Sequence, residues 1–166
     1  TYNCDVSVRQ ELEILLKQIL KNHPQINCLI SNAGSGVFGP IENFSTLQID
    51  NFMATNLTSH IVITKLLLPH FKTNKIGDII FIGSEAGLLG AKNGSLYCAA
   101  KFGLRGFSQA LIKDVAKNNI RVSIINPGMV RTAFFDNLNF EPGIDVANAI
   151  SIKDISSTVT YLLNLN

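Results

Sequence analysis

The stretch that most constrains the fold of this chain is the apolar run at residues 78–83, DIIFIG. It is short, rich in β-branched side chains and closed by a glycine. Strands of this kind are buried on both faces, and they occur in parallel sheets that helices cover. Further apolar runs at residues 26–30 and 120–125 predict neighbouring strands. We therefore expect an α/β fold with a parallel sheet.

Helical spacing of apolar residues fills the segments between these strands. One helix is expected to start at Ser45, and Pro69 is expected to end or kink it. An earlier helix is predicted after Ser7, which together with Gln10 has the spacing of a capping box. The later helices are predicted at residues 45–72, 95–118 and 152–163.

Composition limits the classes of function. Apolar residues make up 46% of the chain and charged residues only 16%, which is ample material for the core of one domain. A net charge of +2 without a run of Lys and Arg argues against nucleic-acid binding, and the apolar stretches are too short for a membrane span. The three cysteines, Cys4, Cys28 and Cys98, lack metal-ligand spacing, so we expect reduced thiols in a cytoplasmic protein and no metal site.

Three polar residues are expected to converge beside the strand at residues 78–83. Ser84 follows that strand directly, at the carboxyl end, where open α/β sheets place ligands. Tyr97 and Lys101 lie four residues apart, on one face of the next helix. The group suits proton transfer, because a neighbouring ammonium can lower the phenol pKa from about 10. A surface tyrosine beside a solvated lysine would show the same spacing.

Taken together, these residues resemble the Ser…Tyr-x-x-x-Lys site of the short-chain dehydrogenases/reductases. The loop Asn32-Ala33-Gly34 and the segment PGMVRT at residues 127–132 match other parts of the family pattern. Ser31 stands where the family has an asparagine. The resemblance covers nearly the whole chain and implies a Rossmann-like doubly wound parallel sheet, in part, with three α/β/α layers in a single domain of residues 1–166.

The resemblance implies a role for each catalytic residue. Tyr97 would be the general acid/base, and Ser84 would bond the substrate oxygen. Lys101 would lower the Tyr97 pKa and hold the nicotinamide ribose. Asn56, inside the apolar helix of residues 45–72, would keep a water of the proton relay. A solvent-facing amide is the alternative for Asn56.

The implied cofactor is NADP or NAD. Asp5 and Val6 would lie at the adenine, although Asp5 could also be an ordinary residue before a helix. Residues 133–150 would form an apolar substrate lid. The residues that the resemblance places at the cofactor are Asp5, Val6, Asn32, Ala33, Gly34, Tyr97, Lys101, Pro127, Gly128, Val130 and Thr132.

Two other patterns are interpreted as structurally ordinary. Residues 34–39 satisfy G-x-G-x-x-G, but Pro40 follows at once and no helix opens within the motif, so a loop is predicted. The histidines show no ligand spacing, and His60 and His70 are expected at a helix surface or end.

The family pattern extends beyond this sequence at both ends. The Gly-rich phosphate loop and the final strand are not part of it, so the choice between NAD and NADP cannot be read. We expect that the native protein is longer, and that the 166 residues alone fold poorly or only as an oligomer. The family also implies a homodimer or homotetramer, built on the helices at residues 45–72 and 95–118.

The sequence therefore predicts an NAD(P)-dependent oxidoreductase that interconverts a carbonyl and an alcohol of a small molecule. Within the family, the sequence as a whole most resembles reductases of 3-oxoacyl groups or 3-hydroxy acids. A non-catalytic α/β binding or scaffold protein is the alternative. A serine hydrolase is a weaker one, because the residues around Ser84 lack the G-x-S-x-G elbow.

Overall fold

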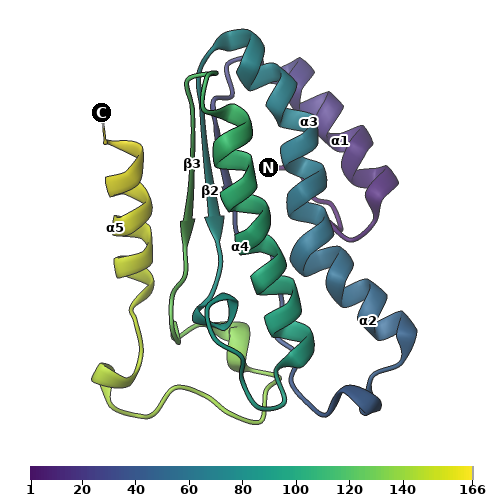
Figure 1. Ribbon diagram of the computed structural model, residues 1–166, viewed down its shortest axis with the longest axis vertical. Coiled ribbons are helices and arrows are strands. Elements are labelled where there is room, and N and C mark those ends of the chain that lie inside the picture. Colours follow the sequence, from purple (N-terminus) through teal and green to yellow (C-terminus); the bar gives the residue numbers. More distant parts are fainter. Residues whose placement is uncertain (166) are drawn as a thin grey trace.

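The computed structural model describes residues 1–165 and contains, in that part of the chain, one parallel sheet of three strands in the order β1-β2-β3 (Figure 1). The strands are β1 (Cys28–Ser31), β2 (Gly77–Ile82) and β3 (Ile120–Ile125). Both pairings are parallel, so all three carboxyl ends lie at one edge of the sheet. The predicted strands are confirmed, with β1 beginning at Cys28.

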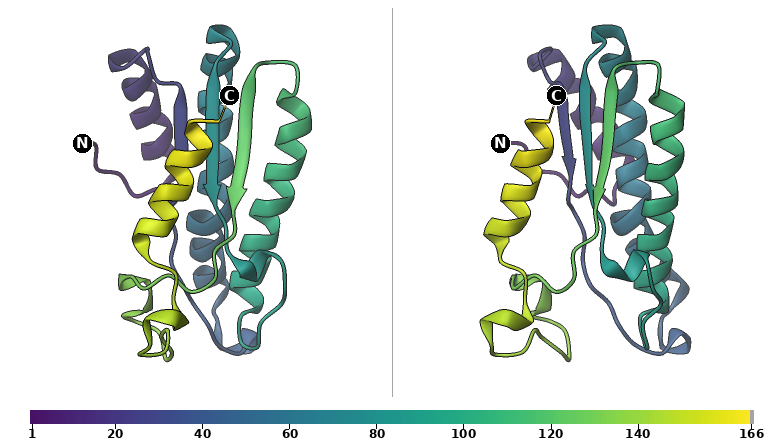
Figure 2. Two further views of the ribbon diagram at one scale, coloured as in Figure 1. Left: turned by 90° about the vertical axis from the view of Figure 1, so that its left-hand side faces the viewer. Right: turned by 60° about the vertical axis from the view of Figure 1, so that its left-hand side comes forward.

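Helices cover both faces of this sheet. Figures 1 and 2 show α1, α3 and α4 on one face and α5 on the other, which confirms the predicted three layers. The helices are α1 (Arg9–Asn22), α2 (Thr46–Met53), α3 (Ser59–Asn74), α4 (Ser95–Val115) and α5 (Ile152–Leu163). Within residues 1–165, none of them combines the length and the hydropathy that a membrane crossing would require.

The main core lies between the sheet and the helices α1, α3 and α4. Ile79 and Phe81 of β2 point into it, and Phe71 of α3 and Leu104 of α4 close over them. All four side chains are fully buried. A Cβ atom at Gly77 would come within 2.7 Å of the Phe71 ring, so this strand start needs glycine for close packing.

The helix predicted at residues 45–72 is divided into three parts. The capping box of Ser45 and Gln48 starts α2, and a π-helical turn at Ala54–Thr58 joins α2 to α3. Pro69 does not end α3, which continues to Asn74. A proline removes only its own helical N–H bond, and the surrounding packing of α3 outweighs that loss.

The predicted capping box at the start of α1 is wrong. Helix α1 begins at Arg9 without a side-chain cap. The backbone N–H and the hydroxyl of Ser7 both donate to Oδ1 of Asp5, at 2.9 and 2.7 Å. These bonds also hold the pKa of Asp5 below its usual value. Ser7 therefore bonds with the nearby Asp5 and does not cap the helix, as the sequence pattern had predicted that it would.

Candidate active site

Polar residues gather where the carboxyl ends of the strands meet. The N–H of Ser84, after β2, donates to Oδ1 of Asn126, after β3, at 3.3 Å. The hydroxyl of Ser84 accepts the N–H of Ala86 at 3.2 Å and begins a short 3-10 turn. A Cβ atom at Gly83 would collide with the Asn126 amide, so the glycine lets the two strand ends approach. This hydrogen bonding fixes Ser84 beside the helix that follows.

Tyr97 and Lys101 lie on the inner face of α4, and both are buried, with exposures of 8% and 5%. The Lys101 Nζ atom lies over the Tyr97 ring, 5.8 Å from its centroid. The same atom donates to the carbonyl of Ile82, at the end of β2, at 3.1 Å. The pair is therefore part of the interior next to Ser84, and a solvated surface pair is excluded.

Burial dominates the electrostatics of this pair. It raises the pKa of the Tyr97 phenol, and the hydrogen bond with the Ser84 side chain opposes the rise in part. It lowers the pKa of Lys101 to about 8. The prediction that Lys101 holds the Tyr97 pKa below its ordinary value is not what this structure shows. Desolvation penalises the charged form of each group and is the largest cause of both shifts.

Asn56 is completely buried, at 0% exposure, within the π-helical turn. Its Oδ1 accepts the N–H of Ser35 at 3.0 Å, and its Nδ2 donates to the carbonyl of Phe52 at 3.1 Å. A Cβ atom at Gly34 would lie 2.9 Å from the same Oδ1. Asn56 thus holds the loop that follows β1, and the solvent-facing alternative is excluded.

The residues predicted at the cofactor fall into three groups. Asn32, Ala33 and Gly34 follow β1 at the carboxyl edge of the sheet, in a loop that, as predicted, contains no helix.

Pro127 and Gly128 follow β3, and the carbonyl of Pro127 accepts the N–H of Glu85 at 2.9 Å. Val130 forms a parallel bridge with Ile150, and Thr132 caps the short turn Ala133–Phe135. This group therefore lies beside the turn that Ser84 starts.

Asp5 and Val6 form the third group, near the start of α1. Asp5 is exposed and bonded to Ser7. Val6 lines a hollow of about 320 Å³ together with Ala54 and Thr58, the two ends of the π-helical turn. This places Val6 next to the helical turn that carries Asn56.

Aromatic side chains cover Tyr97. Phe38 and Phe134 lie with their ring centroids 5.1 and 5.9 Å from that of Tyr97. Phe38 also meets Phe140 at 4.9 Å. The predicted lid therefore contacts Tyr97 directly through Phe134. A second lid residue, Phe140, reaches Tyr97 indirectly, because it packs on Phe38.

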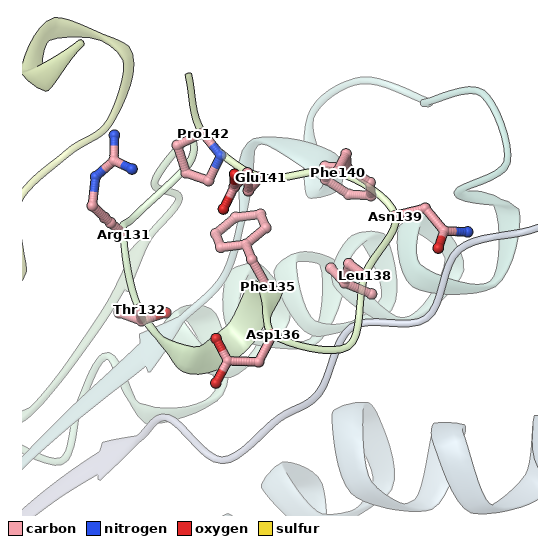
Figure 3. Close-up of a pocket in the computed structure, with 9 residues that line it drawn as sticks. All are labelled: Arg131, Thr132, Phe135, Asp136, Leu138, Asn139, Phe140, Glu141 and Pro142. Atoms are coloured by element: carbon pink, nitrogen blue, oxygen red, sulfur yellow. The ribbon is translucent and has the colours of Figure 1, made fainter. Parts of the chain in front are cut away.

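A cavity of about 650 Å³ is lined by residues of the lid and by the two residues before it. Figure 3 draws these residues. The Phe135 ring points into the space that the loop encloses, whereas Asn139 points away from it (Figure 3). The cavity is lined by Arg131, Thr132, Phe135, Asp136, Leu138, Asn139, Phe140, Glu141 and Pro142. Because Thr132 is one of them, the cavity adjoins the segment predicted to bind the nicotinamide.

His60 contradicts the prediction of a helix-surface residue. It is 1% exposed, and its Nδ1 lies 2.6 Å from Oγ of Ser31, the last residue of β1. Burial lowers its pKa to about 4, and the charge of Lys101 adds to this. The sequence contained a signal for the burial of His60, because His60 follows Asn56 by four residues and therefore lies on the same helix face.

None of the three histidines serves Ser84 as a base. His23 bonds with Tyr2, His60 with Ser31, and His70 with the carbonyl of Ile26. The serine-hydrolase alternative therefore has no support in this geometry.

Comparison with known proteins identifies the family of this chain. The model of the short chain dehydrogenase family matches residues 1–142. A 3-oxoacyl-(acyl-carrier-protein) reductase of Haemophilus influenzae is 32% identical over 164 residues, which are 95% of this chain and 68% of the relative. Carbonyl reductase family member 4 of Xenopus laevis is 35% identical over 164 residues, with 97% and 70% covered.

Solved structures show the same fold. A metagenomic short-chain oxidoreductase in complex with NADP superposes with a TM-score of 0.84 at 26% identity, covering 99% of this chain and 67% of the other. Serine dehydrogenase from Escherichia coli gives a TM-score of 0.83 at 28% identity, covering 99% and 69%. The chain belongs to the short-chain dehydrogenase family and is an NAD(P)-dependent oxidoreductase acting on carbonyl or alcohol groups.

Proposed function

We propose that this protein reduces the carbonyl group of an apolar small molecule, with Tyr97 as the proton donor. The observation that carries the proposal is the burial of Tyr97 beside Ser84 and Lys101. Because burial raises the phenol pKa, Tyr97 keeps its proton at neutral pH. A protonated phenol is the form that donates to a carbonyl oxygen, which is the role that the proposal gives to Tyr97.

The residues at the edge of the sheet fit a nicotinamide cofactor. Gly34 and Gly128 follow two strand ends, where a Cβ atom would meet the side chains of Asn56 and Glu85. Thr132 and Lys101 offer a hydroxyl and an ammonium as hydrogen-bond donors. We assign the ribose hydroxyls to Lys101 and the carboxamide to the segment around Val130 and Thr132. When bound, the reduced nicotinamide supplies a hydride for the carbonyl carbon.

Each remaining residue has a separate task in this scheme. Ser84 donates a hydrogen bond to the carbonyl oxygen and stabilises the charge that develops there. Tyr97 then delivers its proton to the same oxygen. Asn56 holds the loop that carries Gly34, because its amide is already engaged by Ser35 and Phe52. The relay water predicted at Asn56 stays a prediction.

The aromatic cover of Tyr97 favours an apolar substrate. Phe38 and Phe134 pack on the Tyr97 ring and Phe140 packs on Phe38, and beside these rings a hydrated polar group would lose water without compensation. Two relatives are a 3-oxoacyl reductase and a carbonyl reductase. Acyl chains and aromatic ketones are therefore the substrate classes that we propose.

Self-association is part of the proposal. Phe102 and Ile112 are exposed on α4, the helix on which the predicted homodimer or homotetramer would be built. Burial of such side chains between two copies would remove apolar surface from water.

The decisive experiment is Tyr97→Phe in the native protein. The variant keeps the ring that packs on Phe38 and Phe134, so the fold and the cofactor affinity should be retained. It removes the proton donor, so turnover should fall by about 10²–10⁴-fold. Acetoacetyl-coenzyme A and acetophenone serve as probe substrates, with NADPH and NADH oxidation followed by absorbance and cofactor binding by calorimetry.

Tyr161→Phe is the matched control, because Tyr161 is 64% exposed on α5, the helix on the other face of the sheet. It should leave turnover unchanged. Full turnover by the Tyr97→Phe variant would refute the assignment of Tyr97.

A further inference from the structure

Two side chains of one helical face hold the loop that follows β1. Asn56 binds Ser35 at the far end of this loop, through the Ser35 N–H at 3.0 Å. His60, four residues further along, binds Ser31 at the near end, with 2.6 Å between Nδ1 and Oγ. The three residues between these anchors are Asn32, Ala33 and Gly34.

The buried His60–Ser31 pair stabilises the core less than two apolar side chains would. Both side chains are buried, and the Phe81 ring packs edge-on against the imidazole, with 6.5 Å between centroids. Nε2 of His60 is buried and forms no hydrogen bond of normal geometry within residues 1–165, and a weaker contact with the backbone of Ala33 opposes the fall of the His60 pKa. A buried polar atom without a full hydrogen bond destabilises a fold, whereas an apolar pair of similar volume would not.

We propose that His60 is a positioning residue that fixes the carboxyl end of β1 and, through it, the cofactor-facing loop of residues 32–34. The proposal rests on the proposed function in one respect, the assignment of that loop to the adenosine side of the cofactor. The hydrogen bond with Ser31 is the link, since Ser31 is the last residue of the strand and directly precedes Asn32.

The environment keeps this link uncharged. Burial and the charge of Lys101 lower the pKa of His60 to about 4, so the imidazole is neutral at physiological pH. A neutral imidazole has one nitrogen that donates and one that accepts, and either arrangement bonds the Ser31 hydroxyl. Because loop backbones must match a dinucleotide closely, a small displacement of residues 32–34 is enough to weaken binding.

Four variants of the native protein test the proposal. Ser31→Ala removes the bond with the smallest change in volume, and His60→Leu removes it from the other side. His60→Asn restores it, because the asparagine amide reaches about the position of Nδ1. Thr64→Val is the matched control, since Thr64 is equally buried on α3 but bonds only the carbonyl of His60 within its own helix.

The readouts are the dissociation constants of NADPH and NADH by calorimetry and the hydrogen exchange of amides 32–35 without any ligand. Ser31→Ala and His60→Leu should each weaken the better-bound cofactor about tenfold and speed exchange in the loop, while kcat at saturating cofactor changes less than threefold. A fifth variant, which combines Ser31→Ala with His60→Leu, should bind the cofactor no more weakly than either single variant. His60→Asn should bind within about threefold of the wild type.

The proposal is overturned if Ser31→Ala binds the cofactor and exchanges like the wild type, whether or not His60→Leu folds. It is equally overturned if Thr64→Val reproduces the loss, because the effect would then be one of helix packing. Loop exchange and cofactor affinity need no substrate, so a failure of the Tyr97 assignment leaves this test intact.

Discussion

At the scale of the residue, burial decides the chemistry of Tyr97 and Lys101. Removal from water penalises the charged form of a side chain, which is the phenolate of Tyr97 and the ammonium of Lys101. The pKa of Tyr97 is therefore raised and that of Lys101 is lowered to about 8. The spacing of the two residues predicts their contact, but the direction of the Tyr97 shift follows from their surroundings.

His60 makes stability depend on pH. Its folded pKa of about 4 lies below the unfolded value of 6.5, so the unfolded chain binds a proton first. The stabilisation is complete above pH 6.5 and is lost as pH falls toward 4, by about 3 kcal/mol in total. Urea unfolding between pH 7 and pH 4.5 measures it, and His60→Asn should show a flatter dependence. Equal slopes for both proteins would contradict the prediction.

Two glycines should respond in opposite ways to substitution by alanine. At Gly34 the new Cβ would lie 2.9 Å from Oδ1 of Asn56, so Gly34→Ala should displace the loop and weaken cofactor binding at least tenfold. At Gly106, on the exposed side of α4, nothing lies within 4 Å, so Gly106→Ala should stabilise by about 0.5–1 kcal/mol. Calorimetric titration and urea unfolding distinguish the two, and unchanged cofactor affinity in Gly34→Ala would refute the contact.

At the scale of the element, the helical segment before β2 combines a regular start with an irregular middle. Ser45 and Gln48 cap α2 reciprocally, whereas the π-helical turn at Ala54–Thr58 is not signalled by the spacing of apolar residues. Such turns often lie at functional sites. Here the turn contains Asn56, and α3, which begins directly after it, contains His60. The two residues that hold the loop after β1 therefore lie in and next to this turn.

The two serine patterns at helix starts give a direct test of capping. Ser45→Ala should lower the free energy of unfolding by about 1 kcal/mol, because it removes a formed capping box. Ser7→Ala should cost less, because α1 has no side-chain cap and the bonds to Asp5 are exposed. Urea unfolding of both variants gives the comparison, and a larger loss in Ser7→Ala would contradict it.

At the scale of the whole molecule, the two faces of the sheet are stabilised very differently. Helix α4 buries residues along its length, whereas α5 has no buried side chain. The guanidinium of Arg121 on β3 donates to the carbonyls of Leu163 and Leu165 and so joins the end of α5 to the sheet. The apolar core lies almost entirely on the side of α1, α3 and α4.

Hydrogen exchange in the native protein should reveal this asymmetry. Amides of α5 should exchange at least a hundredfold faster than those of the buried half of α4, because opening α5 exposes little apolar surface. Mass spectrometry of peptides from both helices measures the difference. Equal protection would show that α5 is held by more than these contacts.

Local pattern was sufficient for the strands, for most helices and for the convergence of Ser84, Tyr97 and Lys101. Strand composition, helical spacing and the shared edge of a parallel sheet are properties of neighbouring residues or of the fold class. The comparisons confirm the family to which that pattern pointed. The wrong predictions at Ser7 and His60 involve polar groups with a choice of partner, and the expected fall of the Tyr97 pKa overlooked the burial of that side chain.

The sequence by itself therefore determined the element order, the edge at which the site lies and the residue types available there. Only the tertiary structure decided that His60 turns inward to Ser31, that Asn56 holds Ser35, and that burial raises the pKa of Tyr97. The reason is physical. A hydrogen-bond partner and a local dielectric are set by residues distant in the chain, and these come together only when the helices pack on the sheet.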